Sequence, residues 1–378
     1  MAISRLYLSP GLFGFERIGS YVYFHHLEQG LLRRFADAGR ETRAHRVNAS
    51  PTASIRRRAE TLFTAIATTW RPGDSLHLVG HSTGGLDARL LAAPAARVGK
   101  PGSLAAIKAD LRSITCMNTP HRGTPLAAFF ATLSGQRLLY FLSAATVPVL
   151  HLGSPPIALT SALLAALPRP DRALGMRVAL LDRASEALIG ALDDLSSHDL
   201  RIWLDDLQHD QAGILQLAPE AMDVYAALAA DDPAVVYQCS ASWVPAPGMK
   251  SWARAAASPW TSASATLFAT LHRLTAAQHP LYTCEPEGVA WRQAVLQQVG
   301  EVPPSGANDG IVPFRSQLHG ALVWAGHGDH LDVVGHFAGS GPAENEHHDW
   351  LTSGARFDRR RFDSLLDAVA AGMLGAEG

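Results

Sequence analysis

One short segment combines a nucleophilic side chain with the glycines that a tight turn needs. Residues 80–84 read Gly-His-Ser-Thr-Gly, with Ser82 at their centre. A strand-like apolar run ends directly before this segment, and a helix-like run begins at Leu86. Such a turn presents the serine hydroxyl at a helix N-terminus, where developing negative charge is stabilised. The pattern predicts that Ser82 is a nucleophile, and an ordinary glycine–serine turn is the alternative.

A serine nucleophile needs a base that takes its proton and an acid that orients the base. After a turn of this kind, the acid and then the histidine follow later in the chain, on loops after late strands. Asp309 lies in an Asn-Asp-Gly turn, and His330 follows the last predicted strand, so both satisfy this order. The alternatives for the base are His327, His336, His347 and His348. The alternatives for the acid are Asp329 and Asp332, although both lie very near His330 in sequence.

The negative oxygen that forms during acyl transfer needs two backbone N–H donors. Thr83, the residue after the predicted nucleophile, is expected to supply one of them. The loop of residues 10–14 contains two glycines that let the backbone bend, and Leu12 within it is expected to supply the other. A simple glycine turn is the alternative for this loop.

Composition indicates a globular enzyme with a large core. The chain has 378 residues, of which 17% are charged and 47% apolar, and its net charge is −2. These values exclude a disordered chain and give no basic surface for nucleic acid, so no nucleic-acid partner is expected. The arginine clusters 56–58 and 359–361 are interpreted as solvated faces of helices.

The three cysteines do not suggest a disulfide scaffold. Cys116 and Cys239 lie in strand-like runs and are expected to be buried, while a bridge between Cys239 and Cys284 stays open. The N-terminus reads as a first strand rather than a signal peptide, which predicts a cytoplasmic protein.

Alternating strands and helices predict an α/β fold with a mostly parallel sheet flanked by helices. Residues 1–125 and 233–378 are assigned to this core, and 245–305 are read as largely irregular. The predicted strands are 6–8, 43–47, 75–79, 111–117, 234–240 and 321–324, and the predicted helices are 23–38, 54–70, 86–91 and 357–373.

Residues 126–232 form almost only helix-like patterns and are predicted to be a helical cap or lid inserted into the core. Within them, residues 138–168 contain no Asp, Glu, Lys or Arg, which is long enough to span a bilayer. Several prolines interrupt this stretch, so no transmembrane span is predicted. An apolar cap over the site is favoured over a buried helical hairpin.

Taken together, these segments resemble the motifs of the bacterial triacylglycerol lipases of the true-lipase group, within the α/β-hydrolase superfamily. The similarity concerns the oxyanion loop, the nucleophile turn, a Thr-Pro-His-x-Gly segment, the loop of the acid and a His-Leu-Asp segment. These motifs correspond in order to residues 9–15, 80–85, 119–124, 307–312 and 330–332.

The resemblance implies an α/β-hydrolase fold with a large helical cap insertion and a serine carboxylester hydrolase, either lipase or esterase. It favours His330 over His327 as the base, and thus a Ser82, Asp309 and His330 triad working through an acyl-enzyme without a cofactor. The expected substrate is a lipid or another acyl ester, at a lipid–water interface. An acyltransferase or thioesterase with the same triad, and a non-catalytic lipid-binding protein, are the alternatives.

The chain departs from this group at three places. Pro10 replaces a histidine of the oxyanion loop, and Arg315 and Ser316 stand where related lipases often carry a disulfide cysteine. Related lipases often bind a structural calcium, and Asp332 matches one of its carboxylate ligands. No aspartate occurs in residues 245–305 to supply a second, where Glu285 and Glu287 are the candidates, and no metal ligand is assigned.

Overall fold

A parallel sheet forms the centre of the molecule in the computed structural model. The structure describes residues 3–12, 14–152, 185–186, 189–190, 194–245, 258–277, 289–338 and 346–378. The strand order is β4-β1-β5-β6-β7-β8, and all neighbouring pairs are parallel. The strands are β1 (Ser4–Ser9), β4 (Thr42–Arg46), β5 (Ser75–His81), β6 (Leu111–Met117), β7 (Val236–Trp243) and β8 (Ala321–His327). Each predicted strand overlaps one of these six.

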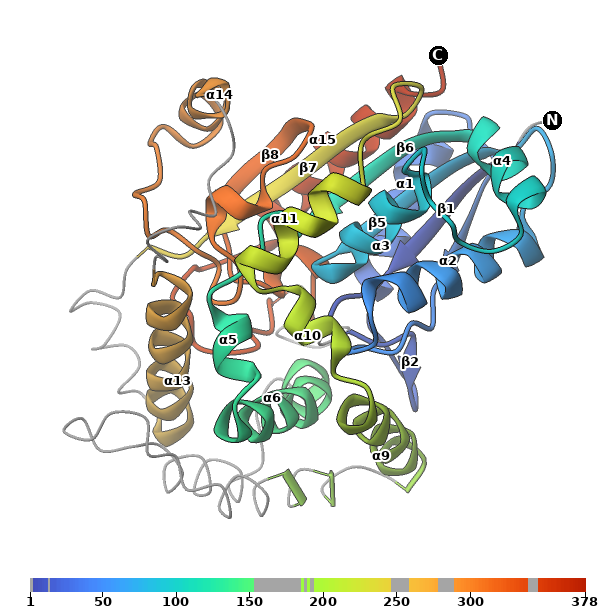
Figure 1. The fold of residues 1–378 in the computed structure, drawn as a ribbon. Helices are drawn as coiled ribbons and strands as arrows, with labels where there is room; N and C mark the ends of the chain where they lie inside the picture. Colours follow the sequence, from blue (N-terminus) through green and yellow to red (C-terminus); the bar gives the residue numbers. More distant parts are fainter. Residues whose placement is uncertain are drawn as a thin grey trace.

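Helices cover both faces of the sheet (Figure 1). On one face α1 (His25–Asp37) packs beside α15 (Arg359–Gly375). On the other face α2 (Ile55–Thr69) and α3 (Thr83–Ala92) lie together, with α4 (Pro101–Ala109) next to α2. The predicted α/β fold is therefore confirmed. Helix α4 was not predicted, because its alanine- and glycine-containing sequence has little helical periodicity.

The position of each strand in the sheet follows its sequence. Central β5 and β6 are buried along almost their whole length, as their apolar sequences require when helices cover both faces. Edge strand β4 reads Thr-Arg-Ala-His-Arg and is only partly buried. Charged side chains on an edge strand discourage pairing with another chain. A short antiparallel ribbon of β2 (Arg17–Ile18) and β3 (Tyr21–Val22) lies outside the main sheet.

The described part of residues 126–232 is almost all helical, as predicted. It contains α5 (Leu126–Phe130), α6 (Leu133–Leu152), α9 (Asp194–His209), α10 (Ala212–Gln216) and α11 (Pro219–Leu228). Helices α5, α6 and α9 lie beyond one end of the sheet in Figure 1, and α11 returns beside α3. Of the charge-free stretch 138–168, residues 153–168 lie outside the described residues. Among those described, no helix has the length and apolar character that crossing a membrane requires.

The reading of residues 245–305 as largely irregular is wrong for their described parts. Helix α13 (Pro259–Thr275) begins with a capping box in which Ser258 and Thr261 satisfy each other's backbone N–H groups. Helix α14 (Ala290–Val299) ends at Gly300, which adopts the left-handed conformation common after helices. Alanine-rich sequences favour helix, and these caps fix where the two helices start or stop.

Both described cysteines are buried free thiols, as expected for Cys116 and Cys239. Cys239 accepts a hydrogen bond from the backbone N–H of His319 at 3.4 Å. Cys284 lies outside the described residues, and so do Glu285 and Glu287, the candidates for a second calcium carboxylate.

Candidate active site

The turn between β5 and α3 is the tight turn that the sequence predicted, and its backbone is strained. Ser82 adopts a positive φ of 55° with ψ of −127°. A Cβ atom at Gly80 would lie 2.2 Å from the carbonyl carbon of Gly84, and one at Gly84 would lie 2.1 Å from the carbonyl oxygen of Ser9. Neither position can hold a side chain. The two glycines therefore allow the sharp turn that aims Ser82 away from the sheet.

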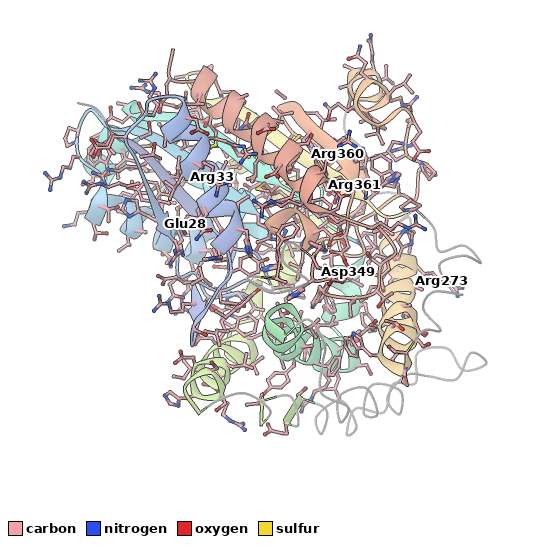
Figure 2. The ribbon with its side chains drawn as sticks, turned by 180° about the vertical axis from the view of Figure 1, so that it is seen from behind. Glu28, Arg33, Arg273, Asp349, Arg360 and Arg361 are labelled. Atoms are coloured by element: carbon pink, nitrogen blue, oxygen red, sulfur yellow. The ribbon has the colours of Figure 1, made fainter. Side chains whose placement is uncertain are left out.

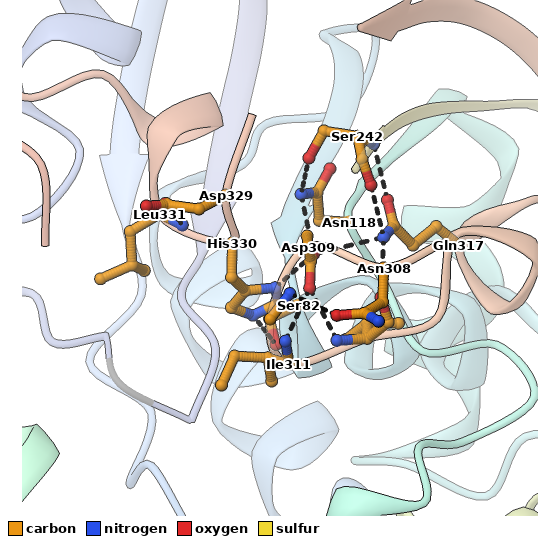
Figure 3. Close-up of polar contacts among 12 residues, drawn as sticks. Ser82, Asn118, Ser242, Asn308, Asp309, Ile311, Gln317, Asp329, His330 and Leu331 are labelled. Carbon is orange, nitrogen blue, oxygen red and sulfur yellow. Dashed lines mark hydrogen bonds and ion pairs between the residues drawn. The ribbon is translucent and has the colours of Figure 1, made fainter. Parts of the chain in front are cut away.

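Three side chains from distant parts of the chain form one hydrogen-bonded series (Figure 3). The Ser82 hydroxyl lies 2.9 Å from Nε2 of His330, and Nδ1 of His330 lies 2.7 Å from Oδ2 of Asp309. Because a carboxylate only accepts, Nδ1 carries the proton and Nε2 is free to accept from Ser82. All three residues are at most 3% exposed. The structure thus brings together Ser82, Asp309 and His330.

Four further donors hold the Asp309 carboxylate. Its Oδ1 accepts from the backbone N–H groups of Ile311 at 2.9 Å and Val312 at 2.6 Å. Its Oδ2 accepts from Nδ2 of Asn118 at 3.0 Å and from Nε2 of Gln317 at 3.2 Å. These donors satisfy both carboxylate oxygens. The Asp309 side chain is therefore held in place beside His330.

Sequence reasoning missed the two amide side chains beside Asp309. Asn118 directly follows β6 and has a positive φ of 48°, so its position at a strand end was a usable signal. Gln317 ends the short helix η1 (Phe314–Gln317), and no sequence pattern distinguished it. Ser242 on β7 links the pair, since its Oγ accepts from Asn118 and its carbonyl accepts from Gln317. Figure 3 shows this network above Asp309.

The rival bases all have other partners. His327 contacts the exposed Glu301 at 3.0 Å, and the His336 ring lies against Tyr21. His347 donates from Nδ1 to Asp349 at 3.0 Å, and the backbone N–H of His348 donates to the carbonyl of His336.

The rival acids brace the turn that carries His330. Oδ1 of Asp329 accepts from the N–H groups of Leu331 at 3.0 Å and Asp332 at 3.1 Å. Oδ2 of Asp332 accepts from the N–H of Asp329 at 2.7 Å. Both carboxylates therefore fix the local backbone, whereas Asp309 is the one carboxylate that bonds the His330 ring among the described residues.

The loop after β1 lies directly against Ser82. A Cβ atom at Gly11 would be 2.4 Å from the Ser82 Cβ, and the N–H of Gly14 closes a turn by donating to Gly11 O at 3.1 Å. Leu12 lies inside this turn. Thr83 is the first residue of α3, so its N–H has no acceptor within the helix. The two predicted N–H donors thus belong to the loop that packs against Ser82 and to the residue that follows Ser82.

Arg58 anchors this loop, which corrects the interpretation of residues 56–58 as a solvated face. Arg58 is 1% exposed, and its guanidinium pairs with the buried carboxylate of Asp87 at 2.9 Å. It also donates to the carbonyls of Ser50, at 2.7 Å, and Pro10. Burial raises the pKa of Asp87 to about 6, against the opposing effect of Arg58. A guanidinium therefore fixes the loop in which Pro10 replaces the family's histidine.

His81, next to Ser82, positions the backbone of His330. Its Nε2 donates to the carbonyl oxygen of His330 at 2.8 Å, so its Nδ1 accepts from the Tyr23 hydroxyl at 3.0 Å. Burial, helped by the nearby His330, lowers the pKa of His81 well below its ordinary value. His81 is therefore neutral at physiological pH and acts as a fixed donor.

Apolar side chains of the site loops and of residues 126–232 form one continuous cluster. This arrangement gives the site a hydrophobic surround with few polar groups. The loops contribute Leu12, Phe15, Ile311 and Leu331, and the helical segment contributes Leu126, Phe130, Leu138, Trp203 and Leu204.

The possible side-chain metal ligands around Asp332 differ from the carboxylates that the resemblance implies for a calcium site. Calcium takes six to eight oxygen ligands, mostly carboxylates, carbonyls and waters. The group of possible ligands found around Asp332 instead contains His347 and Asp349, within 4.8 Å of one another. An imidazole nitrogen is a ligand for zinc and similar metals rather than for calcium.

Comparison with known proteins supports the fold and does not supply a family. No protein-family model matches the sequence, and no curated protein matches it. Among solved structures, the chain is similar to EstA from Clostridium botulinum, with 14% identity, a TM-score of 0.50, and coverage of 96% of this chain and 87% of that one.

Two further structures have similar coverage and lower scores. Lipase 1 from Pelosinus fermentans has 16% identity, covers 91% of this chain and 95% of its own, and has a TM-score of 0.46. Staphylococcus hyicus lipase has 15% identity, covers 99% and 96%, and has a TM-score of 0.49. The sheet order, the helices on both faces and the likeness to EstA establish that this chain has an α/β-hydrolase fold.

Proposed function

We propose that this protein is a serine carboxylester hydrolase of the lipase or esterase kind. The observation that carries the proposal is the hydrogen-bonded series from Ser82 through His330 to Asp309, at 2.9 and 2.7 Å. A nucleophile, a base within hydrogen-bond reach and an acid that orients the base are what acyl transfer through a covalent intermediate needs.

The first half of the reaction forms an acyl-enzyme. Nε2 of His330 takes the Ser82 proton as Oγ attacks the ester carbonyl carbon, and the N–H groups of Leu12 and Thr83 hold the resulting oxyanion. The carbon–oxygen bond to the alcohol then breaks, and the alcohol leaves with the proton from His330. The Asp309 carboxylate stabilises the imidazolium between these two steps.

The second half releases the acid. His330 takes a proton from water, whose oxygen attacks the acyl carbon, and the same N–H groups hold the second oxyanion. The bond to Ser82 breaks, and the proton returns from His330 to Oγ. Each step uses only this chain's residues, so the mechanism needs no cofactor.

We assign residues 126–232 as a cap over the site, with 1–125 and 233–378 as the hydrolase core. The apolar cluster that joins cap helices to the site loops favours acyl chains of medium or greater length. The finer proposal is therefore a lipase-like preference, with a substrate held at a lipid–water interface.

The test is hydrolysis of p-nitrophenyl esters from acetate to palmitate by the wild type and by Ser82→Ala. We expect kcat to fall by at least about 10⁴-fold in the variant. The matched control is Ser240→Ala, because Ser240 is equally buried and its Oγ has no hydrogen-bond partner among the described residues. The control should retain wild-type turnover.

A covalent probe makes the result independent of substrate choice. A fluorophosphonate should add one phosphonyl group to Ser82 in the wild type and in Ser240→Ala, as mass spectrometry of the peptides would show. Turnover that survives in Ser82→Ala would refute the assignment. Labelling without hydrolysis, together with acyl transfer to an added alcohol or thiol, would identify a transferase instead.

A further inference from the structure

A second group of ionisable side chains lies behind the turn that carries His330. Asp329 and Asp332 come from this turn, and His347 and Asp349 come from a later segment. The two segments are held together by backbone contacts. Phe337 and His347 form an isolated antiparallel β-bridge, and the N–H of Ala338 donates to the backbone carbonyl of Glu346. Figure 2 shows Asp349 below the first turn of α15, on the side hidden in Figure 1.

Two ligand atoms in this group are buried without a hydrogen bond. Oδ1 of Asp332 and Nε2 of His347 have no hydrogen-bond partner among the described residues, and they face each other at 3.4 Å. Asp332 is 1% exposed, and the His347 side chain is 5% exposed. Oδ2 of Asp329 is a third such atom. Buried polar atoms without partners are rare in folded proteins and are commonly explained by a bound ion or water.

The position of the proton on the His347 ring decides which of its nitrogens can bind a metal. Nδ1 of His347 lies 3.0 Å from the Asp349 carboxylate, which can only accept, so Nδ1 carries the proton. Nε2 is then the ring nitrogen that faces Asp332 Oδ1, at 3.4 Å. A histidine that binds a metal usually donates its other N–H to a carboxylate in this way, which fixes the ring for the metal.

The ion-pair contacts of this group run to His347, whose Nε2 lies 3.4 Å from Asp332 Oδ1 and whose Nδ1 lies 3.0 Å from Asp349 Oδ1. No arginine or lysine forms an ion pair with Asp329, Asp332 or Asp349 among the ion pairs of the described residues. Arg361, which lies nearby, donates to the carbonyls of Ala355 at 2.8 Å and Arg356 at 2.6 Å instead. Buried carboxylates are expected to be paired or to coordinate a metal.

The spacing also fits a small tetrahedral ion. Zinc binds histidine nitrogen and carboxylate oxygen at about 2.0–2.2 Å, so two such ligands on a tetrahedral ion are about 3.4 Å apart. The observed separation of Nε2 and Oδ1 is 3.4 Å. The rings of Phe337 and Phe357 flank His347, each at 5.3 Å between centroids, and give the apolar surround that favours a tightly held ion.

We propose that Asp332 and His347 bind a zinc-class divalent ion, with Asp349 orienting His347 and Asp329 adding negative charge. The ion would fix the segment 346–349 onto the turn that carries His330, so its role is to position that turn. The donor set differs from the all-oxygen set of a lipase calcium site. The proposal stands on this group alone and does not depend on the proposed hydrolase activity.

The first test measures metal content and thermal stability rather than activity. The full chain without a histidine tag is stripped with a chelator, then dialysed against zinc, calcium or magnesium. We expect one zinc per chain by elemental analysis, and a melting temperature at least about 3 °C higher with zinc than with chelator. Calcium and magnesium should have smaller effects.

Variants separate this site from adventitious zinc binding. His347→Gln and Asp332→Asn should lose zinc, and Asp349→Asn should weaken it by about 10- to 100-fold. The matched control is His327→Gln, because His327 also pairs with a carboxylate at 3.0 Å but lies on the surface side of β8 with Glu301. This control should bind zinc as the wild type does.

Cobalt supplies a readout that needs no stability change. Co²⁺ bound to the wild type should give the visible absorption of a four-coordinate site, and His347→Gln should not. Circular dichroism of each variant shows whether it is folded. Wild-type protein that binds neither metal, or zinc binding that persists in folded His347→Gln, would overturn the proposal. A larger stabilisation by calcium than by zinc would also overturn it.

Discussion

Two buried carboxylate–histidine pairs lie within one region of the chain, and they differ in how many hydrogen-bond donors each carboxylate has. Asp309 beside His330 has four additional donors, and no carboxylate oxygen lacks a partner. Asp332 beside His347 has one backbone donor, and the two facing ligand atoms have none. The first pair is complete within the protein, whereas the second has the form of a site that needs a cation.

The largest expected effect comes from breaking the complete pair. Asp309→Asn keeps the size of the side chain but removes the charge and favours the wrong tautomer of His330. We expect kcat for ester hydrolysis to fall by about 10⁴-fold. The control is Asp367→Asn, since Asp367 is an exposed residue on α15 whose one ion pair within the described ranges is with Arg34. Activity of Asp309→Asn within tenfold of the wild type would show that another carboxylate orients the base.

Arg58 and Asp87 show a third way to satisfy a buried carboxylate, by a cation from the protein itself. Arg58→Met would leave the Asp87 carboxylate with only the Ser9 hydroxyl as a side-chain donor among the described residues, and it would remove the donor to the carbonyl of Pro10. We expect a loss of about 3–5 kcal/mol in the free energy of unfolding, measured by urea denaturation. The neighbouring Arg57→Met is the control, because Arg57 is 70% exposed at the side chain and should change stability by less than about 0.5 kcal/mol. Equal effects at both positions would contradict the buried role of Arg58.

The three residues Ser82, Asp309 and His330 show which parts of the site could be predicted from the sequence. Ser82 was found because the elbow is local, with both glycines and the flanking strand and helix within a few residues. Asp309 and His330 were found because chain order in this fold limits where the partners lie. Both the local turn pattern and the order of the motifs can be read from a single sequence. The three side chains could therefore be predicted without knowledge of their distances.

Burial and long-range contacts could not be predicted in the same way. Arg56, Arg57 and Arg58 are identical in type, and only the packing of α2 against α3 decides that the third is buried. Asn118 contacts Ser242 and Asp309, which both lie far away in sequence. A single sequence carries no signal for such pairs, because their partners depend on how the sheet and loops meet.

Asp332→Asn is expected to change stability by a smaller amount. The sign of this change tests whether the pair of Asp332 and His347 needs a cation. In chelator, the amide keeps an oxygen for the N–H of Asp329 and can donate from Nδ2 to Nε2 of His347. We therefore expect the metal-free variant to be more stable than metal-free wild type by about 1–3 kcal/mol in urea denaturation. With zinc the order should reverse. A variant that is less stable under both conditions would show that Asp332 needs no cation.

The smallest expected effect concerns a histidine that faces a cation instead of a carboxylate. Nδ1 of the buried His121 accepts from Arg89 at 3.1 Å, and burial, helped by Arg89, lowers its pKa well below the ordinary value. Below about pH 6.5 the unfolded chain protonates this histidine while the folded chain does not. The unfolded state then binds more protons, so stability must fall as the pH falls from about 6.5 toward the lowered pKa.

His121→Asn tests this sign, because the amide oxygen can still accept from Arg89 while the titrating group is gone. Between pH 6.5 and pH 5 the free energy of unfolding of the wild type should decline more steeply than that of the variant. The difference should reach at most about 1.4 kcal/mol per pH unit, which is the contribution of one proton. Parallel slopes would show that His121 is protonated in the folded state, and that a buried imidazole in this fold can gain charge beside a guanidinium.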